Sequence, residues 1–245
     1  MSLFKKNKEL PIAKNPFVTA IIVAAGNATR MNGINKQFLF IDGVPVLIRT
    51  LKAFEECEYI SEIVIATKSE DIPNVHSMIK DYQISKVSDI VTGGKTRAES
   101  VCAAIKRCSP FSEYFAIHDG ARPLVTNKII SDVVLKAFET KAAATGTKVK
   151  DTIKVVDDNK IIVSTPNRNN LWAVATPQVF ERTLYLSALD TVANSSEFTD
   201  DCKLIEEYGA DVSMVEGSYQ NLKITTPEDS LFAEAIIFSR GENID

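Results

Sequence analysis

The stretch Thr19-Ala-Ile-Ile-Val-Ala-Ala-Gly26 decides the fold class of this chain. Its uncharged, largely β-branched residues predict a short strand that is buried on both faces and ends at the glycine. Arg30 and Lys36 follow and place two cations just beyond that strand. Ligands of open α/β sheets bind beyond the carboxyl ends of the strands, where free N–H groups favour phosphate. The segment therefore predicts either a phosphate-binding loop or an ordinary glycine turn with solvated cations.

Strands and helices alternate along the rest of the first half of the chain. Further strands are expected at 62–67, 86–92 and 113–119, and helices at 45–57, 73–82 and 96–108. Thr96 and Glu99 have the spacing of a capping box, and Thr126 can cap the next helix. This alternation predicts a parallel, right-handed α/β sheet.

The alternation is interrupted after the fourth strand. Residues 152–156 and 160–165, joined by the turn residues 157–159, predict a β-hairpin arm at about 149–167, which invites a partner subunit. The tail then returns to α/β, with Thr199 starting a helix through Tyr208 and Pro227 opening the last helix after Thr226. We expect a polar N-terminal extension over 1–15 and a single domain over 16–245.

Composition narrows the class of protein. The 245 residues are 45% hydrophobic and 24% charged with a net charge of −4, so the basic excess of a nucleic-acid or anionic-membrane binder is missing. The longest apolar run is far below the ~20 residues of a membrane span, and the N-terminus lacks the apolar region of a signal peptide. Four scattered cysteines and two histidines predict reduced thiols and no zinc site. We expect a cytoplasmic protein that binds neither nucleic acid nor membrane.

Two further segments could carry chemistry. The strand ending in His118 and Asp119 places a carboxylate where it can reach Mg²⁺, which prefers one or two carboxylates completed by waters and phosphates, or where it caps a turn. His118 is expected to be a packed histidine rather than a catalytic base. The segment Gly93-Gly94-Lys95-Thr96 opens a helix, but position 89 is Asp where a P-loop requires glycine, so an ATPase or GTPase is not expected.

Taken in order, eight short motifs resemble the 2-C-methyl-D-erythritol 4-phosphate cytidylyltransferase family over about residues 19–238. They are AAGNATRM, NKQF, GGKTRAESV, HDGARP, NRNNLW, TPQ, FTDD and NLKITTPED. The resemblance implies a doubly wound, mostly parallel Rossmann-like sheet and a homodimer whose hairpin arms interlock. It also implies Mg²⁺ as cofactor and two substrates, CTP and a polyol phosphate.

The resemblance assigns roles residue by residue. The cations expected at the triphosphate are Arg30, Lys36 and Lys223, and Asp119 would hold Mg²⁺. The residues expected around the rest of CTP are Ala24, Ala25, Gly26, Gly94, Lys95, Ser100 and Gly120. Arg168 and Thr152 would reach from the arm to the acceptor in the neighbouring subunit's site, with Arg168 counted among the catalytic cations. Further acceptor positions are Arg122, Thr176, Thr199 and Asp200.

Three positions depart from the family pattern. Ala28 stands in place of a second glycine, Val23 in place of a common proline, and Lys95 in place of a frequent acidic residue. Ala28 could restrict the loop near the triphosphate, and Lys95 leaves a backbone rather than a carboxylate contact to the base.

The reaction that the resemblance implies transfers CMP from CTP to 2-C-methyl-D-erythritol 4-phosphate and releases pyrophosphate. No general base is required, because a phosphate monoester with a second pKa of about 6 is mostly dianionic at pH 7. The alternatives are ribitol 5-phosphate cytidylyltransferase, a sugar-1-phosphate nucleotidyltransferase, and a non-catalytic nucleotide-sensing protein with the same fold.

Overall fold

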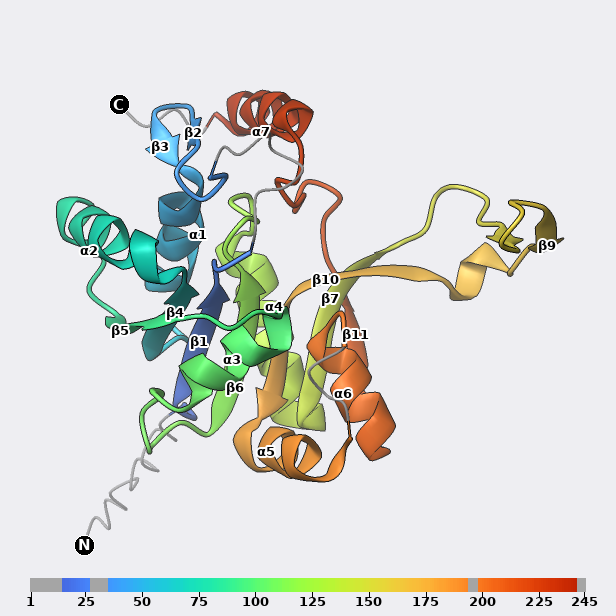
Figure 1. Cartoon of the computed structure of the whole chain (residues 1–245), viewed down its shortest axis with the longest axis horizontal. Helices are drawn as coiled ribbons and strands as arrows, with labels where there is room; N and C mark the ends of the chain where they lie inside the picture. Colours follow the sequence, from blue (N-terminus) through green and yellow to red (C-terminus); the bar gives the residue numbers. More distant parts are fainter. Residues whose placement is uncertain (1–14, 27–34, 194–197, 242–245) are drawn as a thin grey trace, which may run out of the picture.

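The structure is a computed structural model, and it describes residues 15–26, 35–193 and 198–241 (Figure 1). Its centre is a seven-stranded sheet in the order β11-β7-β10-β6-β1-β4-β5. The strands are β1 (Val18–Val23), β4 (Glu62–Thr67), β5 (Val87–Thr92), β6 (Tyr114–Asp119), β7 (Ala142–Lys148), β10 (Trp172–Glu181) and β11 (Ser213–Glu216).

Strand direction follows the expected pattern with one exception. β1 pairs in parallel with β4 and β6, β4 with β5, and β11 with β7. β10 is antiparallel to both of its neighbours, β6 and β7. The prediction of a doubly wound, mostly parallel α/β sheet is confirmed. β7 was not predicted, because its sequence AAATGTK lacks the β-branched aliphatic residues that mark the other central strands.

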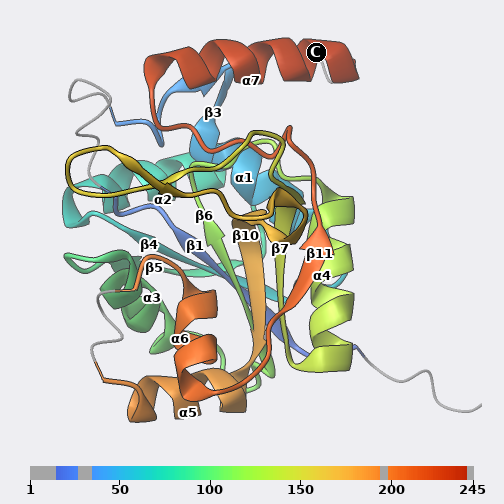
Figure 2. The ribbon, with the colours of Figure 1, turned by 90° about the vertical axis from the view of Figure 1, so that its right-hand side faces the viewer.

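Helices cover both faces of the sheet (Figure 2). One face packs against α1 (Val46–Glu55), α2 (Ile72–Asp81) and α4 (Asn127–Thr140), with Leu51 and Val133 in the core between them. The other face packs against α3 (Arg97–Ile105), α5 (Arg182–Thr191) and α6 (Asp201–Tyr208). Because both faces are covered, β1, β4 and β6 are almost wholly buried, as their apolar sequences predict.

A third, smaller core lies beyond the carboxyl ends of the strands. There α7 (Pro227–Arg240) packs with the small hairpin of β2 (Phe40–Ile41) and β3 (Val44–Pro45), for which no strands were predicted. Ile41 and Ile237 are buried in this core. The segment that leads into α7 carries Lys223, so this core places a cation from the end of the chain beside the sheet.

The hairpin arm extends away from the sheet (Figure 1). Its two short strands, β8 (Val155–Val156) and β9 (Ile162–Ser164), pair antiparallel, so the predicted hairpin is confirmed. Its apolar side chains are exposed: Ile161 is 64% and Val163 66% accessible. A one-turn 3₁₀ helix, η3 (Arg168–Asn170), then leads into β10.

Most helix boundaries follow the predicted caps, and one is corrected. The Thr96–Glu99 capping box and the Thr126 cap are both present. α6, however, is capped by Asp200 rather than started by Thr199, because the Asp200 carboxylate accepts the N–H of Lys203. Positions 1–14 of the expected N-terminal extension lie outside the described residues. In the part of the chain that the structure describes, no helix is long and apolar enough to cross a bilayer.

Candidate active site

A cavity of about 580 Å³ opens at the carboxyl ends of β1, β4, β5 and β6. The chain leaves β1 toward β4 on one side and returns to β6 on the other, which makes this edge the switch point of the sheet. Each strand end contributes to the lining. The lining residues include Ala25, Gly26, Lys36, Gln37, Lys68, Ser69, Glu70, Gly93, Gly94, Lys95, Arg97, Ser100, Asp119 and Lys223.

The two glycines after β5 are required by close packing. A Cβ on Gly93 would collide with the Cβ of Ala25 and lie 2.8 Å from the Ser100 hydroxyl. A Cβ on Gly94 would collide with the side chain of Glu99. Glycine therefore brings the loop against the end of β1 and leaves its backbone open to the cavity.

The same loop is fixed by the start of α3. The Ser100 hydroxyl accepts the N–H of Gly94 at 3.1 Å and donates to the Thr96 carbonyl at 2.9 Å. The Glu99 carboxylate accepts the N–H groups of Lys95 and Thr96. Ser100, which is expected to lie beside CTP, thus lines the cavity, and its hydroxyl fixes the conformation of the loop.

Asp119 lies at the centre of a cluster of three cations. Its Oδ1 is 3.2 Å from Arg97 Nε, and its Oδ2 is 2.8 Å from Lys223 Nζ and 3.4 Å from Arg122 Nε. Burial alone would raise the pKa of Asp119, but Arg97, Lys223 and Arg122 outweigh burial and hold that pKa well below its ordinary value of 3.8. Asp119 is therefore a carboxylate anion throughout the physiological pH range.

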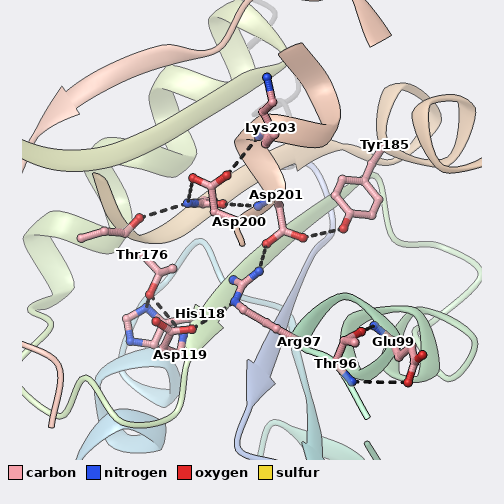
Figure 3. A network of polar contacts seen from close by, with 12 residues as sticks. Thr96, Arg97, Glu99, His118, Asp119, Thr176, Tyr185, Asp200, Asp201 and Lys203 are labelled. Carbon is pink, nitrogen blue, oxygen red and sulfur yellow. Dashed lines mark hydrogen bonds and ion pairs between the residues drawn. The ribbon is translucent and has the colours of Figure 1, made fainter. Parts of the chain in front are cut away.

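Arg97 extends the charged cluster to α6 (Figure 3). Its Nη1 donates to Asp201 Oδ2 at 2.5 Å, and the Tyr185 hydroxyl donates to Asp201 Oδ1 at 2.6 Å. Burial would lower the pKa of Arg97, but Asp201 and Asp119 outweigh it and raise that pKa. No role was predicted from the sequence for Arg97, Asp201 or Tyr185. The available signal was that Arg97 and Asp201 stand inside two of the quoted motifs, GGKTRAESV and FTDD.

His118 lies behind Asp119 and is fully buried. Burial lowers the pKa of His118 to about 3, so the imidazole is neutral. The Thr176 hydroxyl accepts the Asp119 N–H at 3.1 Å and lies 3.0 Å from His118 Nδ1, to which it can donate its own proton. The prediction that His118 is a packed histidine agrees with this arrangement.

The structure brings together many of the predicted site residues. Lining the cavity are Ala25, Gly26, Lys36, Gly94, Lys95, Ser100, Asp119 and Lys223. Ala24 and Gly120 lie at the packed ends of β1 and β6, where their N–H groups bond to Ala66 and Val23 carbonyls. Arg122 and Thr176 lie beside Asp119, and Asp200 caps α6 directly after Thr199. Arg30 and Ala28 lie outside the described residues.

Two predicted residues are not brought to this cavity by their own chain. Thr152 lies in the arm, which extends away from the sheet (Figure 1), Arg168 begins η3 beside it, and neither lines the cavity. Arg168 Nη1 donates to the Lys150 carbonyl at 2.9 Å, at an open hollow of about 480 Å³ that Lys148 and Tyr219 also line.

Comparison with known proteins shows the family of the chain. The family model described as IspD, 2-C-methyl-D-erythritol 4-phosphate cytidylyltransferase, matches residues 18–239. The chain belongs to this cytidylyltransferase family. A 2-C-methyl-D-erythritol 4-phosphate cytidylyltransferase of Caldanaerobacter subterraneus subsp. tengcongensis is 46% identical, over 90% of this chain and 98% of the relative. One from Alkaliphilus oremlandii is 41% identical over 91% of this chain and 96% of its own length.

Solved structures of the cytidylyltransferase family have the same fold. The crystal structure of 4-diphosphocytidyl-2C-methyl-D-erythritol synthase from Anaerococcus prevotii superposes with a TM-score of 0.81 at 32% identity, covering 91% of this chain and 96% of that one. The 2-C-methyl-D-erythritol 4-phosphate cytidylyltransferase of Thermus thermophilus gives 0.73 at 28% identity, covering 90% and 98%. The family resemblance predicted from short motifs is therefore confirmed over nearly the whole chain.

Proposed function

We propose that this chain transfers CMP from CTP to 2-C-methyl-D-erythritol 4-phosphate, a step of isoprenoid precursor biosynthesis. An oxygen of the acceptor phosphate forms a bond to the α-phosphorus of CTP. The bond from that phosphorus to the oxygen bridging to the β-phosphorus breaks, and pyrophosphate leaves with that oxygen and its electron pair. The observation that carries the proposal is the cavity at the switch point of the sheet, where a glycine loop and a cluster of cations lie together.

The main task of such a site is to reduce the electrostatic repulsion between its substrates, because a dianionic acceptor must approach a triphosphate. Each cation held about 4 Å from a phosphate charge offsets roughly 4 kcal/mol at an effective dielectric constant near 20. Lys36, Arg97 and Lys223 line the cavity of a protein whose net charge is −4. Fixed cations of this kind favour the transition state without reorganisation.

Proton transfer from the acceptor is not part of the proposed mechanism. The acceptor phosphate is already mostly dianionic at pH 7, because its second pKa is about 6. The histidine nearest Asp119, His118, is neutral, fully buried and hydrogen-bonded to Thr176. The chain's own groups therefore bind and orient the two substrates rather than remove a proton.

Mg²⁺ is proposed as cofactor, and the donor set fits it. Among residues 15–26, 35–193 and 198–241, no three His, Cys, Asp or Glu side chains lie close enough together to hold a metal ion. A metal site formed by protein side chains alone is therefore not found among these residues. Mg²⁺ is usually held by one or two carboxylates together with substrate phosphates and waters. Asp119, an anion on the cavity wall, would hold it jointly with the triphosphate. When bound, Mg²⁺ would neutralise charge on the triphosphate.

A homodimer is proposed because two acceptor residues lie in the arm. Arg168 and Thr152 do not line their own chain's cavity, and the arm exposes apolar side chains that a second copy would cover. In this proposal each arm supplies Arg168 and Thr152 to the partner's cavity. We also propose that the reaction takes place in the cytoplasm.

The deciding experiment measures pyrophosphate release with CTP and Mg²⁺ at equal concentrations of two acceptors, 2-C-methyl-D-erythritol 4-phosphate and ribitol 5-phosphate. Selective release with the first acceptor is expected. Release only with ribitol 5-phosphate would keep the donor and the site but change the acceptor, and no release with either would overturn the proposal. Omitting Mg²⁺ in a parallel series tests the metal requirement separately.

A further inference from the structure

We infer that Arg97 is a positioning residue that orients the Asp119 carboxylate and ties it to the start of α6. The inference rests on the proposed cytidylyl transfer, because Asp119 matters as a ligand only for a nucleotide–metal complex. Arg97 is the first residue of α3, and its side chain joins one carboxylate on β6 to another on α6 (Figure 3). Two distant segments thus depend on one guanidinium.

The bridge uses separate nitrogens of one rigid plane. Nε lies 3.2 Å from Asp119 Oδ1, and Nη1 lies 2.5 Å from Asp201 Oδ2. A guanidinium presents its donors in a fixed fork, whereas a lysine ammonium is a single point charge on a flexible stem. Lysine at position 97 could therefore keep the charge but not both contacts.

Arg97 decides which oxygen of Asp119 is left for a ligand. Oδ1 is held by Arg97, while Oδ2 is shared by Lys223 and Arg122. Lys223 is 37% exposed and lines the cavity, so it is the partner that can turn toward an arriving phosphate. Oδ2 would then keep only its longer 3.4 Å contact with Arg122, whereas Oδ1 stays held by Arg97.

Asp201 is held firmly enough to anchor the bridge. Its side chain is 4% exposed, and its Oδ1 accepts the Tyr185 hydroxyl at 2.6 Å. Its backbone N–H donates to Gln178 Oε1 at 3.0 Å. Thr199 and Asp200, predicted to contact the acceptor, come directly before it, so the bridge links the acceptor side of the site to the nucleotide side.

A purely structural role does not account for the third nitrogen. Arg97 Nη2 is buried and has no hydrogen-bond partner among the described residues, and burying an unpaired donor costs free energy. The cluster of Arg97, Arg122 and Lys223 with two carboxylates also carries a net positive charge. An arginine that served stability alone would be expected to pair all its donors and leave the cluster neutral.

The test compares Arg97→Lys, Arg97→Met and the double variant Arg97→Met/Asp201→Asn in the full chain. For each variant, kcat, the two KM values and thermal unfolding are measured, together with calorimetric binding of CTP with and without Mg²⁺. We expect both Arg97 variants to lose about tenfold to a hundredfold in kcat, the range found when groups behind metal ligands are removed. We also expect the gain in CTP affinity that Mg²⁺ gives the wild type to fall by a similar factor.

The double variant separates catalysis from folding. The Arg97→Met protein should unfold more easily, because the buried Asp201 carboxylate loses its cation. Adding Asp201→Asn removes that unpaired negative charge. The unfolding temperature should recover in the double variant and kcat should not. Arg107→Met is the matched control, because Arg107 pairs with Asp89 just beyond the end of α3 and outside the cavity.

Two results would overturn the inference. One is a wild-type kcat in the folded Arg97→Lys or Arg97→Met protein, and the other is full recovery of kcat together with stability in the double variant. A wild-type chain that releases no pyrophosphate from CTP with either acceptor would instead overturn the proposed function. The wild-type assay therefore distinguishes the two failures before any variant is compared.

Discussion

Lys223 Nζ lies 2.8 Å from Asp119 Oδ2, which joins the segment before the last helix to the end of a central strand. The pair places a cation that can move next to an anion that is fixed. The two residues are far apart in the sequence, so the contact exists only in the folded chain. This contact forms the part of the cavity wall where we place the triphosphate.

Replacing Lys223 by alanine should reduce turnover far more than stability. We expect kcat to fall roughly 10²–10³-fold, the usual loss when one preorganised group that stabilises transition-state charge is removed. Asp119 keeps Arg97 and Arg122, so the fold should persist. Steady-state kinetics and thermal unfolding check both parts, with Lys203→Ala, a lysine paired to Glu207 on α6, as control. Turnover close to the wild-type value would exclude Lys223 from the site.

Stability should fall in acid because of Asp119. Its folded pKa lies below the ordinary value of 3.8, so the unfolded chain binds a proton more readily. The stabilisation is complete well above pH 3.8 and is lost as pH falls from there toward the lower folded pKa. Denaturant unfolding between pH 2 and 6 should therefore show a shallower acid slope in Asp119→Asn than in the wild type. Equal slopes would contradict the assignment.

Gly93→Ala should destabilise the chain and impair CTP binding together. The added methyl would collide with Ala25 and press on Ser100, and overpacking of this kind costs about 1–3 kcal/mol. Gly26→Ala is the control for stability, because a Cβ there meets nothing within 4 Å. Denaturant melts of both variants check the stability contrast, and a CTP titration of Gly93→Ala against the wild type checks the binding. A Gly93→Ala protein as stable as Gly26→Ala would show that the loop can shift freely.

The pH dependence of the reaction should come from the acceptor and not from His118. The pKa of His118 is about 3, so it does not titrate between pH 5 and 8, whereas the acceptor phosphate has a second pKa of about 6. We expect kcat/KM for the acceptor to fall as pH drops through about 6. The same limb should persist in His118→Gln even where the absolute rate is lower. If the fall of kcat/KM at low pH is absent in His118→Gln, His118 takes part in the proton equilibrium that controls the reaction.

Mixing two inactive variants should restore activity if each arm completes the partner's site. In a mixed dimer of Arg168→Ala with Lys223→Ala, one cavity carries both defects and the other carries neither. Random exchange of subunits should then recover about a quarter of wild-type activity. Activity is measured after the two proteins are unfolded and refolded together, and each variant refolded alone is the control. No recovery, with mixed dimers present, would place Arg168 in its own chain's site.

Much of the sheet was predictable because its strands carry strong local signals. Residues 63–67 are uncharged and largely β-branched, and the strand predicted over 62–67 coincides with β4. β7 has a weaker pattern, and burial between β10 and β11 makes it a strand where local propensity does not. The antiparallel direction of β10 depends on how the arm returns to the sheet, which periodicity does not encode.

Site residues that belong to a local sequence motif could be predicted. Site residues whose role depends on long-range contacts could not. Asp119 ends a strand and Gly94 lies just after one, so both could be placed from the sequence. Arg97 resembles any polar residue in the first turn of a helix until the fold brings Asp201 to its side chain. Asp200 rather than Asp201 was expected to face the acceptor, and only the structure shows that Asp201 joins the charged cluster.

β10 runs for ten residues from Trp172, at the base of the arm, to Glu181, roughly 33 Å at the usual rise of a strand, and its residues 176–180 are buried. Thr176, which holds the backbone of Asp119, lies midway along it. In the proposed dimer, a partner subunit that binds the arm therefore contacts the segment that continues into β10, the strand that holds Asp119 at the cavity. If the arm mediates the proposed dimer, dilution of the protein should lower activity before it unfolds the sheet.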